Sequence, residues 1–339
     1  MRTSSLILLF LLSFSGLSSQ VTIDDFLEDS YNQLPYRLYI PKNYDISKSY
    51  PLVLFLHGAG QRGDENIFQM DSYAMLFAQD SIQNIQACFV LVPQCPWYDQ
   101  WVNSPWENGS YNIDETPLSA PLSKVIDIIG ILKNDYSIDN SRVYVTGLSM
   151  GGYGTWDIIS RYPLMFAAAI PICGAGDPSK ANRIKHIPLQ FFHSSDDPTV
   201  PVAGSRDMKN ALITENAADF KYKEYDNLGH DCWTSAYFEP GLISWMFSKV
   251  NTSTLEHELL KEENFSVYPN PFFNQLTISF SSKIVVGKME LYSMHGQLVH
   301  SSAIRGFAEI PLHSISSGSY ILKIQEPDGV YFKKLLKKN

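Results

Sequence analysis

The sequence predicts a doubly wound α/β domain, with a mostly parallel sheet, followed by a small all-β sandwich. Two observations support this fold class. From residue 36 to about residue 248, short apolar runs alternate with segments of helical periodicity, which is typical of a sheet covered by helices. After residue 264, short segments of alternating polar and apolar residues are separated by turn signals, which is typical of antiparallel strands.

Continuous apolar runs in the first part indicate central parallel strands, because such strands are buried on both faces. The expected strands are residues 52–56, 88–92, 143–145, 166–172, 187–192 and 220–225. Helices are expected at residues 121–133, 150–162, 202–216 and 238–247. Pro163 ends the second of these helices, because proline cannot continue one.

The second part is expected to form a β-sandwich over residues 265–339. Residues 251–264 are polar and charged and are interpreted as a linker, so the first domain spans residues 20–250. The expected strands of the sandwich are residues 276–280, 288–292, 308–312 and 319–324, with turn signals at 269–271, 294–296, 317–318 and 328–329.

The N-terminus has the pattern of a secretory signal peptide. Arg2 supplies a positive charge, residues 6–12 are apolar, and small residues follow, so we expect residues 1–19 to be removed. The alternative is a membrane anchor, but a span needs about 20 apolar residues and this run is too short. No later segment is long and apolar enough to cross a bilayer.

The strongest motif is Gly147-Leu-Ser149-Met-Gly151, which follows an apolar strand and precedes a helix. A nucleophile elbow requires this context, because small residues two before and two after the serine avoid clashes in a sharp turn. The alternative is an incidental serine in a glycine-rich turn. The partners found downstream favour Ser149 as a nucleophile.

A serine nucleophile needs a base and an orienting carboxylate, which follow it along the chain in this arrangement. Asp196 and Asp197 follow the strand at 187–192; one is expected to be the carboxylate and the other to cap a turn. His230 follows the strand at 220–225 and is the expected base. The histidines excluded by chain order or position are His57, His186, His193, His295, His300 and His313.

An oxyanion hole needs two backbone N–H groups aimed at the developing charge. Met150 is expected to supply one, because it follows the nucleophile. Ala59 or Gly60, in the loop after the strand at 52–56, is expected to supply the other. His57 is interpreted as a brace for this loop that takes no part in proton transfer.

Three tryptophans stand in a loop after the strand at 88–92. A loop at this edge of a parallel sheet lies where ligands bind, so Trp97, Trp101 and Trp106 are candidate substrate-binding residues. They would stack on a phenolic acyl group or a sugar. The alternative is a packed lid that makes no contact with substrate.

The four cysteines are Cys88, Cys95, Cys173 and Cys232, and their spacing matches no zinc motif. Export would permit disulfides. Cys173 and Cys232 both come just after expected strand ends, so they are placed to meet. Buried free thiols are the equal alternative.

The motifs at residues 56–64, 147–152, 173–177 and 229–233 together resemble secreted α/β-hydrolase esterases and "predicted peptidases". This group is related to feruloyl esterases, polyhydroxybutyrate depolymerases and dienelactone hydrolases, and the resemblance covers about residues 35–248. It implies that the carboxylate stands four positions after His193, which selects Asp197. Ser194 departs from the glycine usual in the family. True dienelactone hydrolases use a cysteine nucleophile, so Ser149 argues against that activity.

The tail resembles the C-terminal sorting domain of the type IX secretion system of Bacteroidetes. The matching segments are residues 267–271, 290–296, 317–322 and the basic end at 333–338. The resemblance implies export through the periplasm to the cell surface or medium, with removal of the tail, and a contact with the secretion machinery. The alternative is a carbohydrate-binding or adhesive sandwich, which the lack of an aromatic binding strip disfavours.

Together these features predict a secreted serine hydrolase that cleaves carboxylic esters through an acyl-enzyme, with feruloyl or acetyl esters of plant polysaccharides as candidate substrates. No organic cofactor and no metal are implied. The formal net charge of −9 argues against a nucleic-acid partner. The alternatives are a serine peptidase of the prolyl-oligopeptidase type and a non-catalytic surface protein on a hydrolase scaffold.

Overall fold

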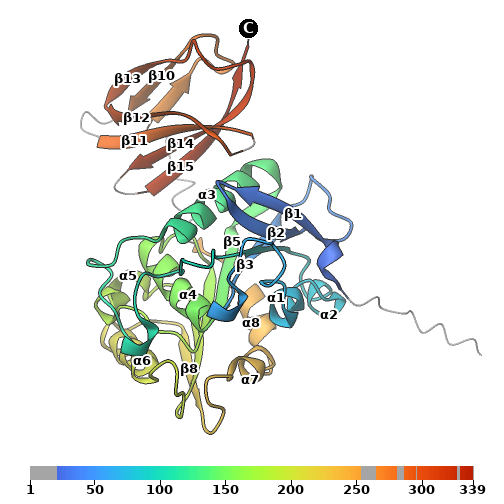
Figure 1. The fold of residues 1–339 in the computed structure, drawn as a ribbon, viewed down its shortest axis with the longest axis vertical. Helices are drawn as coiled ribbons and strands as arrows, with labels where there is room; N and C mark the ends of the chain where they lie inside the picture. Colours follow the sequence, from blue (N-terminus) through green and yellow to red (C-terminus); the bar gives the residue numbers. More distant parts are fainter. Residues whose placement is uncertain (1–20, 253–264, 281–285, 295, 327–328, 339) are drawn as a thin grey trace, which may run out of the picture.

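The computed structural model describes residues 21–252, 265–280, 286–294, 296–326 and 329–338. The expected signal peptide at residues 1–19 and most of the expected linker, residues 253–264, lie outside the described residues. Parts of two expected turns, at residues 295 and 328, also lie outside them. Figure 1 shows an α/β part in which helices flank a central sheet, and a smaller part made of strands.

The first part is built on a sheet of eight described strands, which confirms the predicted α/β class (Figure 1). The first three strands in the spatial order pair antiparallel, and the other neighbours pair parallel. In spatial order the strands are β1 (Phe26–Tyr31), β2 (Leu34–Tyr39), β4 (Phe89–Pro93), β3 (Tyr50–Leu56), β5 (Ile138–Leu148), β6 (Ala168–Ile172), β7 (Leu189–Ser194) and β8 (Phe220–Tyr225).

Helices bury both faces of this sheet, because successive side chains of a strand point to opposite faces. In β3, Leu52, Leu54 and Leu56 belong to one apolar cluster, while Val53 and Phe55 belong to another. The first cluster includes residues of α3 (Ala120–Asp135), α4 (Met150–Arg161), α5 (Ala181–Ile184) and α6 (Ala203–Thr214). The second includes residues of α1 (Ser72–Leu76), α2 (Asp80–Gln83), α7 (Trp233–Tyr237) and α8 (Leu242–Phe247).

The parallel strands bring distant segments to one edge of the sheet. The carboxyl ends of β3, β5, β7 and β8 lie at the same edge, because parallel neighbours run in one direction. The loops after these four strands therefore meet there, although they are far apart along the chain. This edge is where ligands bind in open α/β sheets.

The helix expected at residues 238–247 is wrong in its extent. The structure has two short helices here, since α7 ends at Tyr237 and α8 begins at Leu242. Pro240 cannot donate a helical hydrogen bond, and Gly241 takes the left-handed conformation with φ of 80°. Together these two residues break the helical pattern that their neighbours continue.

The tail forms two antiparallel sheets around its own apolar core, as predicted for a sandwich. Three of its strands, β9, β12 and β15, were not expected from the sequence. One sheet has the order β13 (Phe307–Pro311), β10 (Gln275–Phe280) and β9 (Phe265–Tyr268). The other has the order β12 (Leu298–Arg305), β11 (Val286–Ser293), β14 (Gly318–Glu326) and β15 (Gly329–Lys337).

The tail contacts the first part through a partly charged junction. Lys323 Nζ in β14 lies 2.5 Å from an Asp127 carboxylate oxygen in α3 and 3.5 Å from a Glu290 carboxylate oxygen in β11. The rings of Tyr31 and Tyr292 pack beside this group, with centroids 5.8 Å apart. These contacts place the sandwich against α3 and β1, as Figure 1 also shows.

Candidate active site

Ser149 occupies a sharp turn between β5 and α4. Its backbone has φ of 54° and ψ of −118°, which a residue other than glycine rarely adopts. The flanking glycines leave no room for a side chain: a Cβ at Gly147 would lie 2.4 Å from Gly151 O, and one at Gly151 would lie 1.9 Å from Leu56 O. The structure therefore has the strained strand-to-helix turn of a nucleophile elbow.

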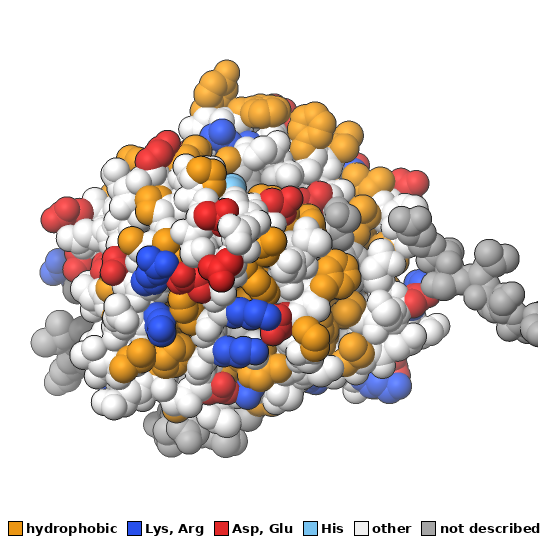
Figure 2. Space-filling model, turned by 90° about the horizontal axis from the view of Figure 1, so that it is seen from below, with side chains coloured by type: hydrophobic (Ala, Val, Ile, Leu, Met, Phe, Trp, Pro, Cys, Tyr) orange, Lys and Arg blue, Asp and Glu red, His pale blue; other side chains and the backbone are white. Residues whose placement is uncertain are grey.

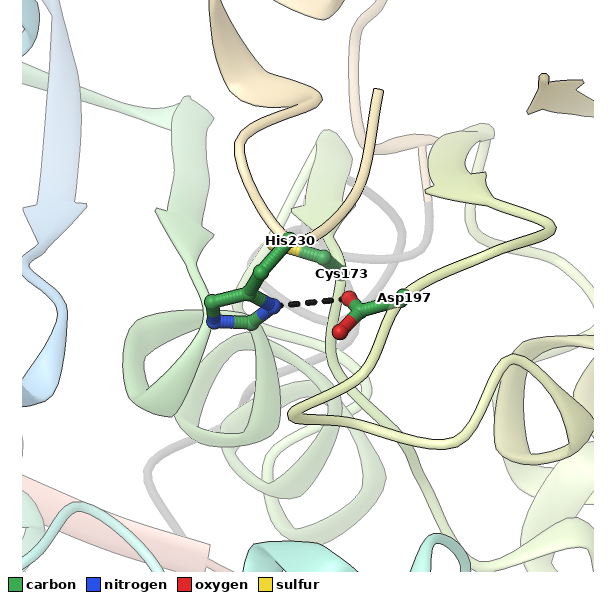
Figure 3. A group of neighbouring side chains, drawn as sticks. All are labelled: Cys173, Asp197 and His230. Carbon is green, nitrogen blue, oxygen red and sulfur yellow. Dashed lines mark hydrogen bonds and ion pairs between the residues drawn. The ribbon is translucent and has the colours of Figure 1, made fainter. Parts of the chain in front are cut away.

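His230 stands between Ser149 and Asp197. Its Nε2 lies 2.8 Å from Ser149 Oγ, and its Nδ1 lies 2.7 Å from Asp197 Oδ2. Figure 3 shows the imidazole pointing its Nδ1 side at the carboxylate. An ionised carboxylate only accepts hydrogen bonds, so Nδ1 carries the proton and Nε2 is free to accept from the serine hydroxyl. The three residues thus have the mutual geometry of a serine–histidine–aspartate triad.

Asp197 is held in place by several donors. Its Oδ1 accepts hydrogen bonds from the N–H groups of Thr199 and Val200, and its Oδ2 also lies 3.2 Å from His193 Nε2. Burial favours the protonated acid, but the hydrogen bonds from His193, His230 and the two N–H groups outweigh it and hold the pKa of Asp197 well below its usual range. The carboxylate is therefore ionised at neutral pH, where it can stabilise a protonated His230.

Asp196 bonds to the loop that carries His230 and, unlike Asp197, does not contact the His230 imidazole in the described hydrogen bonds. Its Oδ1 accepts from Ser194 Oγ at 2.5 Å and from the Gly229 N–H at 3.1 Å. The carboxylate therefore ties the loop that carries His230 to the end of β7. Chain order left open which of the two aspartates orients the base, and the family resemblance selected Asp197. In the structure Asp197 is the one that contacts His230.

The loop after β3 presents two N–H groups at the sheet edge. It forms a short 3₁₀ turn, η2 (Ala59–Gln61), in which the N–H groups of Gln61 and Arg62 bond to the carbonyls of Gly58 and Ala59. The Ala59 and Gly60 N–H groups precede these donors, and the first N–H groups of a helical turn have no partner inside it. Met150 lies at the first position of α4, in the same situation. All three remain candidate oxyanion donors.

His57 braces this loop from inside, as the sequence suggested. Its Nδ1 lies 2.6 Å from Gly58 O, and its Nε2 accepts the Cys95 N–H at 2.9 Å. Complete burial lowers the pKa of His57 from 6.5 to about 4, so the ring is neutral and fixed in one tautomer.

The three tryptophans of the loop at 96–106 have different surroundings. Trp101 is fully buried, and its Nε1 donates to His57 O at 3.0 Å. It therefore supports the loop that follows β3. The expectation that Trp101 binds substrate is wrong, because a fully buried ring cannot contact one. Trp106 is half-buried and packs against an apolar cluster that includes Tyr153. Trp97 is 48% exposed, and its ring packs edge-on against Phe68, which is also exposed. Sequence reasoning missed Phe68, which follows no recognisable motif.

Cys173 lies beside the triad, and one ligand-type atom from each of Cys173, Asp197 and His230 falls within 4.8 Å of the others (Figure 3). Asp197 and His230 already share a hydrogen bond, and burial together with the contact to Cys232 raises the pKa of the Cys173 thiol. A protonated thiol is a poor metal ligand, because metals bind the thiolate. The chemistry of this group therefore suits proton transfer to and from Ser149 better than cation binding.

The rim of the site is acidic and partly apolar. Asp196, Asp226 and Asp231 are exposed on the loops around His230, and Leu228 is exposed among them. Figure 2 shows acidic, basic and hydrophobic side chains interspersed on the face that carries the α6, β8 and α7 end of the molecule. A negative rim repels anions, so it favours neutral substrates and the departure of carboxylate products.

Comparison with known families agrees with this geometry. The family model described as "Phospholipase/Carboxylesterase" matches residues 44–237. The chain belongs to this family. The matched region runs from the approach to β3 to the end of α7, and it therefore includes Ser149, Asp197 and His230.

The proteins to which this chain is similar include esterases and a depolymerase. A solved structure, "Crystal Structure of a Thermostable Esterase", is 41% identical with a TM-score of 0.62 and covers 67% of this chain and 64% of its own. Poly(3-hydroxyalkanoate) depolymerase C of Paucimonas lemoignei is 54% identical over 37% of this chain and 28% of its own. Probable feruloyl esterase C of Aspergillus terreus is 24% identical over 60% of this chain and 68% of its own. The chain spans between 17% and 81% of the lengths of the five curated relatives that it matches.

A second family model, described as "Secretion system C-terminal sorting domain", matches residues 266–338. The tail is thus a type IX sorting domain, which directs the protein to the cell surface or out of the cell. Within the described residues, no helix has the length and apolarity that a membrane span requires.

Proposed function

We propose that this member of the carboxylesterase family is an exported serine hydrolase that cleaves carboxylic esters through an acyl-enzyme. The observation that carries the proposal is the continuous hydrogen-bonded chain from Ser149 Oγ to His230 and on to Asp197 Oδ2, with distances of 2.8 and 2.7 Å. A serine hydroxyl is a weak nucleophile alone, and this arrangement is the one that activates it.

The proposed reaction has two halves. In the first, His230 Nε2 takes the proton of Ser149 as the hydroxyl attacks the ester carbonyl, and then gives it to the leaving alcohol. In the second, His230 activates a water that releases the acid. Asp197 remains ionised throughout and stabilises the imidazolium, which its low pKa supports.

The oxyanion is proposed to bind at the edge formed by α4 and η2. The Met150 N–H and the N–H of Ala59 or Gly60 would donate to it, and such preorganised donors each contribute about 3 kcal/mol to transition-state stabilisation. The neutral His57 and the buried Trp101 hold η2 in place. The donors therefore need no rearrangement during the reaction.

The proposed substrates are neutral esters with an aromatic or sugar-bearing group, such as feruloyl or acetyl esters of a plant polysaccharide. The exposed rings of Trp97 and Phe68 support this, because they offer an apolar surface on the loops that flank η2. The acidic rim supports a neutral substrate. The relatives named as a feruloyl esterase and a poly(3-hydroxyalkanoate) depolymerase support ester chemistry.

The test is a substrate panel applied to the purified exported protein. We expect turnover of p-nitrophenyl acetate and methyl ferulate but not of a proline-nitroanilide peptide, and labelling of Ser149 by a fluorophosphonate. Ser149→Ala should abolish both turnover and labelling. Ser195→Ala is the matched control, since its hydroxyl lies nearby but bonds only to Asp226 in the described contacts.

Two outcomes would overturn the proposal. Cleavage of the peptide without cleavage of the esters would show that the protein is a peptidase and not an esterase. If the protein is folded by circular dichroism but shows neither turnover nor labelling, it is a non-catalytic surface protein.

The contact of the sorting domain with the type IX secretion machinery is likewise proposed. Removal of residues 265–339 should then retain the protein in the periplasm.

A further inference from the structure

Cys173 is buried at the centre of the proposed catalytic group. It follows the last residue of β6, and its φ of 39° lies in the left-handed region that residues other than glycine rarely adopt. The Ser149 N–H, which donates to Ile172 O at 2.9 Å, also faces the Cys173 sulfur. Figure 3 shows the Cys173 side chain close to those of His230 and Asp197. A side chain at this point touches the backbone of the nucleophile.

Cys232 reaches the same point from another part of the chain. It is the N-cap residue of α7, two positions after His230, and its side chain is fully buried. The thiols of Cys173 and Cys232 are in hydrogen-bonding contact, and both belong to the apolar cluster on one face of the sheet. The loop that carries the proposed base and the end of β6 are thus joined through two sulfur atoms.

The other two cysteines have different surroundings. Cys88 Sγ accepts from Gln83 Nε2 at 3.2 Å, and Cys95 lies beside His57 through its backbone N–H. Both are buried, but among the described contacts neither sulfur touches that of another cysteine. Cys88 and Cys95 can therefore serve as controls, because they are buried like Cys173 and Cys232 but have no cysteine partner among the described contacts.

We propose that Cys173 and Cys232 form a disulfide in the exported protein. The sorting domain sends the chain through a compartment where disulfides form and persist. Both cysteines are thiols in the structure, both are fully buried in one apolar cluster, and their side chains interact. A disulfide requires two cysteine side chains that lie close together. The inference rests on export and on this contact, and it stands independently of ester hydrolysis.

The step is a thiol–disulfide exchange with an oxidised dithiol protein or an oxidised low-molecular-weight disulfide. One cysteine thiolate attacks a sulfur of the oxidant and expels the oxidant's other sulfur as a thiolate. The second cysteine thiolate then attacks the first cysteine's sulfur in this mixed disulfide and expels the oxidant's remaining sulfur. Two S–H bonds are lost and one S–S bond is formed. The two electrons and two protons leave with the oxidant, which departs as two thiols. Because both sulfurs are buried in the folded chain, the bond forms before the His230 loop docks.

The bond would restrain the loop that carries His230. Residues 226–231 form neither helix nor strand, and they include Asn227 and Gly229 with φ of 60° and 56°. In the reduced state only hydrogen bonds are described between this loop and the segment 194–197, and they join Asp196 to Gly229, Ser194 to Leu228, Ser195 to Asp226 and Asp197 to His230. The triad is already assembled with both thiols reduced, so the disulfide makes opening of the loop rarer and does not alter the chemistry. The expected effect is on stability against heat.

The experiment is peptide mapping of the exported full chain, unfolded in the presence of N-ethylmaleimide and digested without reductant. We expect a linked peptide pair containing Cys173 and Cys232, with Cys88 and Cys95 alkylated. Alkylation of all four cysteines, or a link that involves Cys88 or Cys95, would overturn the proposal. The map reads the wild-type chain, so it needs neither a folded variant nor an active enzyme.

A second measurement uses Cys232→Ala, with Cys88→Ala as the matched buried control. Dithiothreitol should lower the melting temperature of the wild type and of Cys88→Ala by on the order of 10 °C, since the bond closes a long loop. It should leave Cys232→Ala unchanged. An equal effect of reductant on Cys232→Ala, or no effect on the wild type, would contradict the inference.

Discussion

The Cys95 N–H donates a 2.9 Å hydrogen bond to His57 Nε2, which fixes the proton of this buried imidazole on Nδ1, where it faces Gly58 O. A protonated ring would have no acceptor for its Nε2 proton and would place a charge in the core. The loop that offers the oxyanion donors is therefore braced by a histidine that must stay neutral.

Stability should fall as the pH is lowered from 6.5 towards 4. Burial lowers the pKa of His57 to about 4 in the folded protein, so the unfolded chain binds the extra proton first and the free energy of unfolding rises with pH. The contribution of His57, up to about 3 kcal/mol, is complete above pH 6.5 and is lost as the pH falls towards 4. Urea unfolding of the wild type and His57→Gln at several pH values measures the difference in slope.

His186→Gln is the control for this measurement, because His186 is an exposed histidine. If His57→Gln keeps the wild-type slope between pH 4 and pH 6.5, the buried imidazole is not the group that titrates.

Asp197→Asn should lower kcat by about 10³–10⁴, because the amide cannot stabilise the imidazolium or fix its tautomer. Asp196→Asn should cost less than about tenfold, since an amide oxygen still accepts from the Gly229 N–H. Initial rates on p-nitrophenyl acetate measure both. Equal losses in the two variants would mean that the roles of these neighbours are not separated as the hydrogen bonds indicate.

Gly151→Ala should prevent folding or cost several kcal/mol, since the added Cβ would lie 1.9 Å from Leu56 O and backbone atoms cannot give way. Gly60→Ala should change the free energy of unfolding by less than about 1 kcal/mol, because no atom lies within 4 Å of the added Cβ. Chemical denaturation compares them. A stable, soluble Gly151→Ala would refute the tight turn.

Trp97→Ala should raise KM for methyl ferulate and leave the melting temperature close to that of the wild type, because the ring is half exposed. Trp101→Ala should instead lower the free energy of unfolding by about 3–5 kcal/mol, since its ring is fully buried. A normal KM in Trp97→Ala, measured with both methyl ferulate and p-nitrophenyl acetate, would remove this ring from the substrate surface.

The sequence was most informative where one pattern has one physical cause. Continuous apolar runs predicted the parallel strands. The glycines on either side of Ser149 predicted a sharp turn in which no larger side chain fits. The hairpin of β1 and β2 was missed, because β1 buries only its two end residues while β2 buries a proline and an arginine. Neither pattern alternates, so no strand period is visible.

Ser149 and His230 could be predicted as single residues, but chain order predicted the carboxylate only to the level of the segment. Asp196 and Asp197 are neighbours, so chain order alone could not separate them; the distinction depends on which carboxylate faces inward. The burial of Trp101 could not be predicted either, because a loop has no periodicity that marks its inner side. Phe68 joins Trp97 through a contact between two loops, and no local pattern encodes it.

The charged junction between Asp127 and Lys323 has a consequence for the fate of the tail. Among the described residues, the two apolar clusters on the faces of the central sheet come almost entirely from the first part, and the tail adds only Tyr292 and Ile321 to them. Burial raises the pKa of Asp127, while the Lys323 ammonium counteracts this. If the segment that connects the two parts is cut, water can solvate the two charges separately. The tail can then leave the first part without exposing the apolar core of that part to water.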